Sequence, residues 1–288
     1  MHLFDRPALA ALLRYLVKAS ALALLVAALA GSASAFFLFA LDWATQTREA
    51  NRWLIGGLPL AGFAVGWLYL KWGQSAQAGN VEAGNNLLID EIHDPKNVVP
   101  LRMAPLVLGG TVISHLFGAS VGREGTAVQM GGALADQLTH FFKLNHVDRR
   151  MVLMAGISAG FASVFGTPLA GAVFALEVLA IGRMRLDALL PCVMAAVVAD
   201  QVGLLWGVQH TPYDVGLVPH ITAWLLVAMV VAGAVFGLAG KVFADGTHAL
   251  SAVMKKHIAY APLRPLLGGA VIAAVVMWGS FDRYIGLG

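Results

Sequence analysis

The feature that most constrains this chain is a series of long stretches that contain no Asp, Glu, Lys or Arg. A membrane-spanning helix needs about 20 mainly apolar residues. Seven stretches qualify as candidate spans, one of them interrupted only by Asp200: Ala19–Leu41, Trp53–Leu70, Met103–Gly122, Met151–Leu176, Ala188–Tyr213, Val215–Gly240 and Pro265–Phe281. The sequence therefore predicts a polytopic membrane protein built of helices, which is an all-α fold.

The composition excludes other classes of protein. Of the 288 residues, 59% are hydrophobic and 12% are charged, whereas soluble domains are about 45–50% apolar and about 25% charged. An ordinary soluble enzyme and a disordered chain are both excluded. The net charge of +3 is spread along the chain, so no nucleic-acid partner is expected. Cys192 is the single cysteine, so no internal disulfide can form.

The first stretch also predicts the orientation of the chain in the membrane. Ala19–Leu41 is longer than the apolar core of a secretory signal peptide, and further spans follow it, so we interpret it as a true membrane helix. Arg6, Arg14 and Lys18 precede it. By the positive-inside rule, the N-terminus is expected to be cytoplasmic.

Two Gly-rich segments between the spans are too short to cross a membrane. They are Ala78–Ile89 and Gly125–Ala135, and both adjoin polar or charged residues. Short, Gly-interrupted apolar segments are typical of broken helices at membrane depth. Free backbone N–H groups are tolerated there only inside protein or beside a water-filled cavity. We therefore expect the functional site at these two segments.

The second of these segments predicts an anion site. The run from Gly118 to Gly132 reads Gly-Ala-Ser-Val-Gly-Arg-Glu-Gly-Thr-Ala-Val-Gln-Met-Gly-Gly. Gly122 and Gly125 allow a sharp turn and a close approach of the backbone to a ligand. A helix that begins near Glu124 would direct its free N–H groups and positive dipole end inward, where an anion, or the Glu124 carboxylate itself, can bind. The alternative is that Arg123 and Glu124 form an ion pair on a connecting loop.

This run resembles the anion-pathway motif of the CLC chloride channel and transporter family. The resemblance continues through Met154–Glu177, which in the family is a helix pair that ends in an acidic residue, and it covers roughly Ala19 to Gly288. It implies a single transmembrane domain over residues 1–288, an inverted-repeat helical bundle with broken half-helices. The first repeat would span about 19–213 and the start of the second about 215–288. The family assembles as homodimers with one pathway in each subunit.

The resemblance also implies roles for individual residues. Glu124 corresponds to the gating glutamate, which competes with the anion and carries the proton. Arg123, Thr126 and the backbones of Gly122 and Gly125 would frame the bound anion.

The first segment matches a second anion motif of the family, a Gly-Ser-Gly-Ile-Pro turn at the start of another half-helix. The corresponding residues here are Gly84, Asn85 and Asn86, followed by two leucines. Asn85 stands in the place of the serine and offers an N–H₂ donor to an anion. The alternative is that Asn85 and Asn86 only cap or turn the chain.

Departures from the family pattern resemble its fluoride–proton antiporter branch. They include the replacement of that serine and Thr126 in place of the usual proline. Glu177 is followed by Val178, where chloride–proton exchangers carry an internal glutamate. We interpret Glu177 itself as the end of a helix, in a surface ion pair with Arg183 or Arg185.

The predicted function is therefore CLC-type anion transport, with proton-coupled fluoride antiport in the inner (plasma) membrane of a bacterium. Halide anions, protons and the lipid bilayer are the expected partners, and no cofactor is expected. A passive chloride channel is the alternative mechanism. An enzyme is not expected, because the chain has neither His-Glu-x-x-His nor Gly-x-Ser-x-Gly.

Two further expectations concern the acidic run after Asn86 and the end of the chain. Asp90, Glu91, His93 and Asp94 match no standard spacing of metal ligands, so we interpret them as a half-helix that runs out to water, with no metal site. Family members continue past the point that corresponds to Gly288 with several helices, including a second anion-binding half-helix. The resemblance thus implies a C-terminally truncated member, for which an inactive, membrane-inserted fragment is the alternative function.

Overall fold

The computed structural model describes residues 6–73, 84–93, 97–177, 186–210, 216, 218–279, 281 and 284–286. All regular structure in these residues is helical, which confirms the all-α prediction. The helices are α1 (Arg6–Ala50), η1 (Arg52–Gly57), α2 (Leu58–Leu68), η2 (Tyr69–Gly73), α3 (Gly84–His93), α4 (Met103–Leu116), α5 (Arg123–Phe141), α6 (His146–Phe165), α7 (Pro168–Glu177), η4 (Leu186–Ala188), α8 (Leu189–Leu205), α9 (Ala223–His257) and α10 (Leu263–Gly279).

The helices are long and apolar enough to cross a membrane in several places. Among the described residues, four helical stretches meet the requirements of length and composition: Leu13–Ala50, Arg52–Gly73, Leu186–Leu205 and Ala223–His257. Shorter apolar helices cover Met103–Leu116, Pro168–Glu177 and Leu263–Gly279. The chain is thus a multi-pass integral membrane protein.

One predicted span is wrong in its extent. The uncharged run Met151–Leu176 forms two helices, α6 and α7, and not one. The helix ends before Gly166, which adopts a left-handed conformation (φ 66°) after the last residue of α6. Pro168 then begins α7. Glycine tolerates this conformation and proline is favoured at the first helical position, so the pair ends one helix and starts the next. The helix pair that the family resemblance implied is confirmed.

Two other boundaries differ from the predicted ones. The helix expected over Ala188–Tyr213 ends at Leu205 as α8, and the helix expected over Val215–Gly240 begins at Ala223 and continues to His257 as α9. Thr222 caps α9, since its Oγ1 accepts a hydrogen bond from the backbone N–H of Leu225 at 3.2 Å. The helix continues through the charged residues Lys241 and Asp245 of its second half, which were expected to lie beyond the span.

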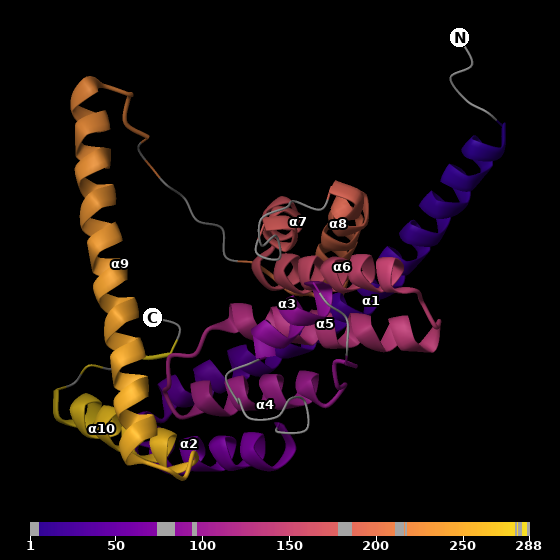
Figure 1. Cartoon of the computed structure of the whole chain (residues 1–288). Coiled ribbons are helices and arrows are strands. Elements are labelled where there is room, and N and C mark those ends of the chain that lie inside the picture. Colours follow the sequence, from indigo (N-terminus) through magenta and orange to yellow (C-terminus); the bar gives the residue numbers. More distant parts are fainter. Residues whose placement is uncertain are drawn as a thin grey trace.

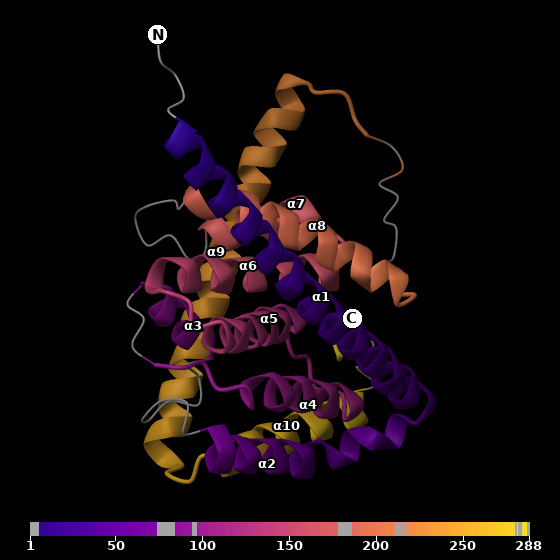
Figure 2. The same cartoon turned by 90° about the vertical axis from the view of Figure 1, so that its right-hand side faces the viewer.

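The centre of the molecule is the pair of helices α5 and α6, which lie one above the other, with α1 running across them (Figures 1 and 2). Helices α1, α4 and α8 pack around this pair, and α7 packs on α6 and α8. A Cβ atom added to Gly131 of α5 would collide with the carbonyl oxygen of Gly156 in α6. One added to Gly160 would collide with the carbonyl oxygen of Ala127. Because small residues line the contact, the two backbones touch.

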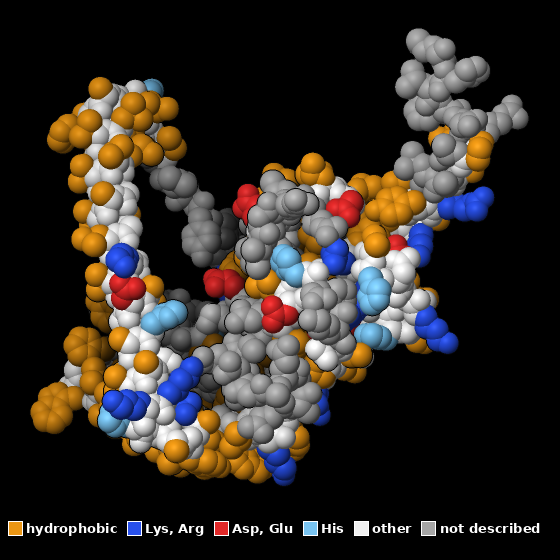
Figure 3. Space-filling view, in the orientation of Figure 1, with side chains coloured by type: hydrophobic (Ala, Val, Ile, Leu, Met, Phe, Trp, Pro, Cys, Tyr) orange, Lys and Arg blue, Asp and Glu red, His pale blue; other side chains and the backbone are white. Residues whose placement is uncertain are grey.

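The smallest of three clusters of buried hydrophobic residues in the described part of the chain joins the C-terminal part to the rest. It contains Ile55, Leu58, Ala273, Val276 and Ile285, and it holds α10 against η1 and α2. Helix α9 stands apart from the other helices except near its C-terminal end, and none of its residues is buried (Figure 1). Its surface is largely apolar along its length, with charged side chains near its middle and basic ones at its C-terminal end (Figure 3).

Candidate anion site

The start of α5 leaves its first backbone N–H groups open. Gly122 precedes the helix in an extended conformation (φ −65°, ψ 127°) and has no side chain that could cap it. The start of α6 is different, because the Asn145 side chain accepts hydrogen bonds from the N–H groups of Val147 and Asp148 at 3.0 and 2.9 Å. An uncapped helix start combines free donors with the positive end of the helix dipole, so α5 can bind an anion there.

Glu124 lies in this open first turn. Its side chain is exposed, and Oε2 lies 3.5 Å from the position that a Cβ atom on Gly122 would occupy. The carboxylate therefore lies over the beginning of its own helix. Within the part of the chain that the structure describes, Glu124 has no hydrogen bond or ion pair. A carboxylate in this position is an anion that can move away without breaking another contact.

Arg123 does not pair with Glu124. Its guanidinium carbon lies 4.9 Å from the centroid of the Phe165 ring at the end of α6. Phe161 packs against Phe165 with the ring centroids 4.7 Å apart, and it stacks on Phe174 of α7 at 4.4 Å. The alternative of a simple Arg123–Glu124 ion pair on a loop is thus not what the structure shows.

These aromatic residues were not among the predicted site residues. The spacing of Phe161 and Phe165, four residues apart, was the only available signal, because such residues lie on one face of a helix. Nothing in the sequence indicated that this face lies under Arg123, since the contact joins residues from α5, α6 and α7.

Thr126 holds the first turn of α5 to α4. Its Oγ1 lies 2.6 Å from Oγ1 of Thr111, and both side chains are buried. The Thr126 hydroxyl is therefore engaged in the helix contact, and the predicted role of Thr126 in framing an anion stays a prediction. Gly125, next to it, is half-buried.

The predicted second anion segment is also a helix start. Gly84, Asn85 and Asn86 form the first turn of α3, and the predicted donor role of the Asn85 side chain stays a prediction. Helix α3 packs on α5 and α6. Leu88 covers Gly132, where an added Cβ would lie 2.5 Å from Leu88 Cδ2.

A cavity lies beside α3 and α5. It measures about 760 Å³ and is enclosed mainly by α2, α4 and α10. Leu87 of α3 and Gln129 of α5 both contribute to its wall. The two predicted site segments therefore line the same half-open cavity, although Glu124 itself does not line it.

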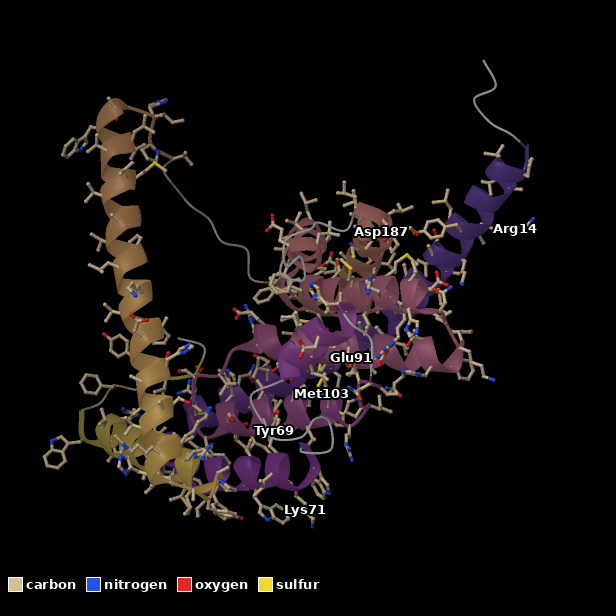
Figure 4. All side chains as sticks on the ribbon, viewed as in Figure 1. Arg14, Tyr69, Lys71, Glu91, Met103 and Asp187 are labelled. Atoms are coloured by element: carbon tan, nitrogen blue, oxygen red, sulfur yellow. The ribbon has the colours of Figure 1, made fainter. Side chains whose placement is uncertain are left out.

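The acidic run that follows Asn86 is divided between two environments. Asp90 is exposed, and Nδ1 of His93 lies 2.8 Å from the carbonyl oxygen of Ile89. Glu91 is only 1% exposed and lies among α3, α5 and α6 (Figure 4). The interpretation that the whole run faces water is wrong for Glu91, which turns inward because Arg149 neutralises it there. Asp94 lies outside the described residues.

The described residues contain no group of three or more potential metal ligands. Glu177 is the last residue of α7 and is exposed. Val178, Arg183 and Arg185 lie outside the described residues, so the predicted surface ion pair of Glu177 stays a prediction.

Comparison with known proteins identifies the family of the chain. A sequence model of the voltage gated chloride channel family matches residues 61–288. The "Chloride/fluoride channel protein" of Pseudomonas syringae pv. tomato is 63% identical over 295 residues, which cover 100% of this chain and 64% of the relative. An H⁺/Cl⁻ exchange transporter of Vibrio vulnificus is 28% identical over 247 residues, or 77% of this chain and 50% of the relative. The chain thus spans about half to two thirds of the length of these relatives.

Solved structures agree in fold. The crystal structure of a CLC-type fluoride/proton antiporter superposes with a TM-score of 0.88 and 32% identity, covering 95% of this chain and 68% of the other. A slow cyanobacterial Cl⁻/H⁺ antiporter has a TM-score of 0.75 at 21% identity, which shows the fold alone. The family model matches well over half of the chain, so this chain belongs to the voltage gated chloride channel family.

Proposed function

We propose that the protein moves halide anions across a membrane, as a fluoride–proton antiporter. The observation that carries this proposal is the exposed Glu124 carboxylate, which lies over the uncapped start of α5 and has no partner among the described residues. Ionisable residues in membrane helices are costly and usually functional. Among the described residues Glu124 has no hydrogen bond or ion pair, and only the dipole of α5 favours its charge, so we assign it a role in transport.

The geometry supports a competition between the carboxylate and the anion. Ionised Glu124 occupies the positive end of α5, and an anion that binds to the N–H groups of Gly125 and Thr126 must displace it. Protonation removes the negative charge and weakens this hold on the helix start. One side chain can thereby couple the movement of a proton to the entry of an anion. Arg123 contributes positive charge beside the same turn.

Fluoride is proposed as the anion on two grounds. Asn85 replaces the serine of the chloride motif and adds an amide donor, which suits a small, strongly hydrated anion. In addition, the 63% identical relative is described as a chloride/fluoride channel protein, and the solved structure with a TM-score of 0.88 is that of a fluoride/proton antiporter. A passive chloride channel is the second candidate, because other relatives are described as voltage-gated chloride channels.

The remaining parts of the proposal concern assembly and location. The protein is proposed to act as a homodimer in the bacterial inner membrane, with its N-terminus in the cytoplasm. The three basic residues at the start of α1, Arg6, Arg14 and Lys18, support this orientation. No resident cofactor or metal is proposed.

The test uses what we call the completed protein, which is residues 1–288 joined to the part of the Pseudomonas relative that has no counterpart in this chain. The purified protein is reconstituted in liposomes, and fluoride efflux and proton uptake are recorded together. A proton gradient should drive fluoride uphill, whereas a passive channel would show a reversal potential that does not depend on pH.

Glu124→Gln is the decisive variant, because an amide cannot carry the proton. We expect proton movement to fall to the level of empty liposomes, with fluoride efflux slowed or uncoupled. Asp90→Asn, which removes an exposed carboxylate elsewhere, is the matched control and should leave coupling unchanged. Undiminished proton pumping by Glu124→Gln would refute the assignment of Glu124.

A further inference from the structure

A buried cluster of charged residues lies at the C-terminal ends of α3 and α5, away from the helix starts that form the candidate anion site. Glu91 is near the end of α3, Asp136 is in the second half of α5, and Arg149 is in the first turn of α6. They are 1%, 0% and 7% exposed, respectively. Nothing in the proposed transport cycle uses them, although buried charges are costly unless they are paired and hydrogen-bonded.

Arg149 is the centre of the cluster. Its Nε and Nη2 donate to the two carboxylate oxygens of Asp136 at 2.7 and 2.9 Å, which is a two-point contact. Its Nη1 donates to Oε2 of Glu91 at 3.2 Å, and Nη2 also donates to the carbonyl oxygen of Asn97 at 2.6 Å. One guanidinium thus joins α3, α5 and the segment that links α3 to α4. The planar fork of arginine suits such a junction, and a lysine cannot reproduce it.

The linking segment is bound to the same carboxylates. The backbone N–H of Asn97 donates to both oxygens of Glu91, at 2.9 and 3.0 Å. The backbone N–H of Val99 donates to Asp136 at 2.7 Å, and the Gln137 side chain donates to the carbonyl oxygen of Val99 at 2.8 Å. Each carboxylate therefore fixes a helix and the linking segment at once.

The consequence for the anion site follows from the length of α3. The helix has 10 residues, and Glu91 lies seven residues after Gly84, or about 10 Å along the axis. A rigid helix that pivots at Glu91 displaces its start in proportion to that length. The start of α3 is one of the two proposed anion-binding ends, and the start of α5, which carries Asp136 on the same rigid helix, is the other. In enzymes a misplacement of about 1 Å can cost about 100-fold in rate, and we expect a bound anion to be sensitive to displacement in the same way.

We infer that Arg149, with Glu91 and Asp136, is a positioning residue for the anion site. The cluster sets the position of the α3 start relative to the α5 start. This relative position in turn determines the affinity and the selectivity for the halide. The inference rests on the proposed function, because it concerns the same site. It differs from a purely structural role in one measurable respect. A structural role changes how much protein is folded, whereas a positioning role changes how each folded molecule binds the anion.

The first test compares Glu91→Gln with Asp90→Asn in the completed protein. In Glu91→Gln, the new amide would place an N–H₂ group among the donors from Asn97 and Arg149, which loosens the end of α3. For the folded, size-selected protein, we expect the half-saturating fluoride concentration and the fluoride-to-chloride efflux ratio to change by about 3-fold to 100-fold. Asp90→Asn changes the neighbouring, exposed carboxylate and should leave both values unchanged.

A second set of variants addresses stability. Arg149→Met alone leaves two buried carboxylates without their cation and is expected to fold poorly. The triple variant Glu91→Gln, Asp136→Asn, Arg149→Met removes all three charges, so it keeps a foldable core without the junction. Its anion selectivity should be altered as in Glu91→Gln, while Arg149→Lys, which retains the charge but not the fork, should have an intermediate effect.

The outcomes separate the two proposals. Unchanged half-saturation and unchanged selectivity in folded Glu91→Gln and in the folded triple variant would overturn the positioning role. A wild-type protein that moves chloride but not fluoride would instead refute the proposed substrate, and the positioning role would still be tested by the half-saturating chloride concentration.

Discussion

Helices α6 and α9 are both largely apolar, yet their environments are opposite. In α6, nearly every residue from Met151 to Val164 is buried, together with Asp148 and Arg149 near its start. In α9, which is 35 residues long and meets the length and composition of a membrane span, no residue is buried. The more buried helix is the one that contains glycine, alanine and serine at the contact, and also the one that contains buried charges.

The difference shows that hydrophobicity does not decide which helix is packed inside a membrane protein. Lipid is as apolar as a leucine side chain, so apolar residues alone do not drive helices together. Close backbone approach at Gly156 and Gly160 holds α6 in place. The glycines of α9 have open space beside them instead, and no described residue approaches a Cβ position on any of them within 4 Å. These glycines are Gly233, Gly237, Gly240 and Gly246.

The largest expected effect concerns the 288-residue chain expressed by itself. We expect it to insert in the membrane but to show no fluoride efflux in liposomes, because α9 buries none of its residues and the anion would be held by α3 and α5 alone. The completed protein is the positive control. Fluoride efflux from the 288-residue chain that is abolished by Glu124→Gln would show that the packed region suffices, and would break the comparison.

The next effect concerns selectivity, which we assign to the packed region only. Asn85→Ser in the completed protein should shift selectivity towards chloride, because it shortens the donor at the start of α3. One hydrogen bond to an anion contributes about 1.5–3 kcal/mol, or roughly a 10-fold to 100-fold change in the fluoride-to-chloride efflux ratio. Thr222→Ser, which retains the cap of α9, is the control. An unchanged ratio would remove Asn85 from the account of selectivity.

A smaller effect is expected from one methyl group placed in each region. In Gly156→Ala, the new Cβ meets the Gly131 carbonyl oxygen and the Ala135 side chain, so α5 and α6 must separate at a cost of about 1–3 kcal/mol. In Gly237→Ala on α9, nothing lies within 4 Å, and the higher helix propensity of alanine should be neutral or stabilising by up to about 1 kcal/mol. Unfolding of the completed protein in detergent measures both. Equal destabilisation would contradict the comparison.

The smallest effect concerns single hydroxyl groups. Thr126→Val removes the hydrogen bond to Thr111 and leaves that buried hydroxyl unpaired, which should cost about 1 kcal/mol. Adding Thr111→Val should recover part of the loss, since no unpaired hydroxyl remains. Thr247→Val on α9 is the control, because the Thr247 hydroxyl donates to the Ala244 carbonyl oxygen of its own helix. A double variant less stable than Thr126→Val would argue against a specific Thr111–Thr126 bond.

The sequence allowed the local features of the site to be predicted. The start of α5 was expected near Glu124, and the helix begins at Arg123. This succeeded because glycines on either side of a charged pair, between apolar runs, restrict the backbone locally. The start of α3 at Gly84 was predicted differently, from the resemblance of Gly84, Asn85 and Asn86 to a half-helix start of the family. Features set by a few neighbouring residues are readable from one sequence.

Features that depend on distant residues were not predicted. Glu91 and Arg149 are 58 positions apart, and neither shows by itself that the other neutralises it. The count of uncharged residues missed the break at Gly166, because it ignores backbone conformation, although Gly166 and Pro168 carried the signal and the family resemblance implied a helix pair there. The engagement of Thr126 with Thr111 was equally invisible, because it depends on how α4 lies against α5.

The contact between the backbones of α5 and α6 has a consequence for how such a protein can change its substrate. At Gly131, Gly156 and Gly160 there is no side chain left to shorten, and any larger residue forces the helices apart. The frame that carries the α5 start is therefore closed to gradual adjustment by mutation. New anion preferences must arise at the starts of the half-helices, where residues such as Asn85 can be exchanged one at a time while the frame stays the same.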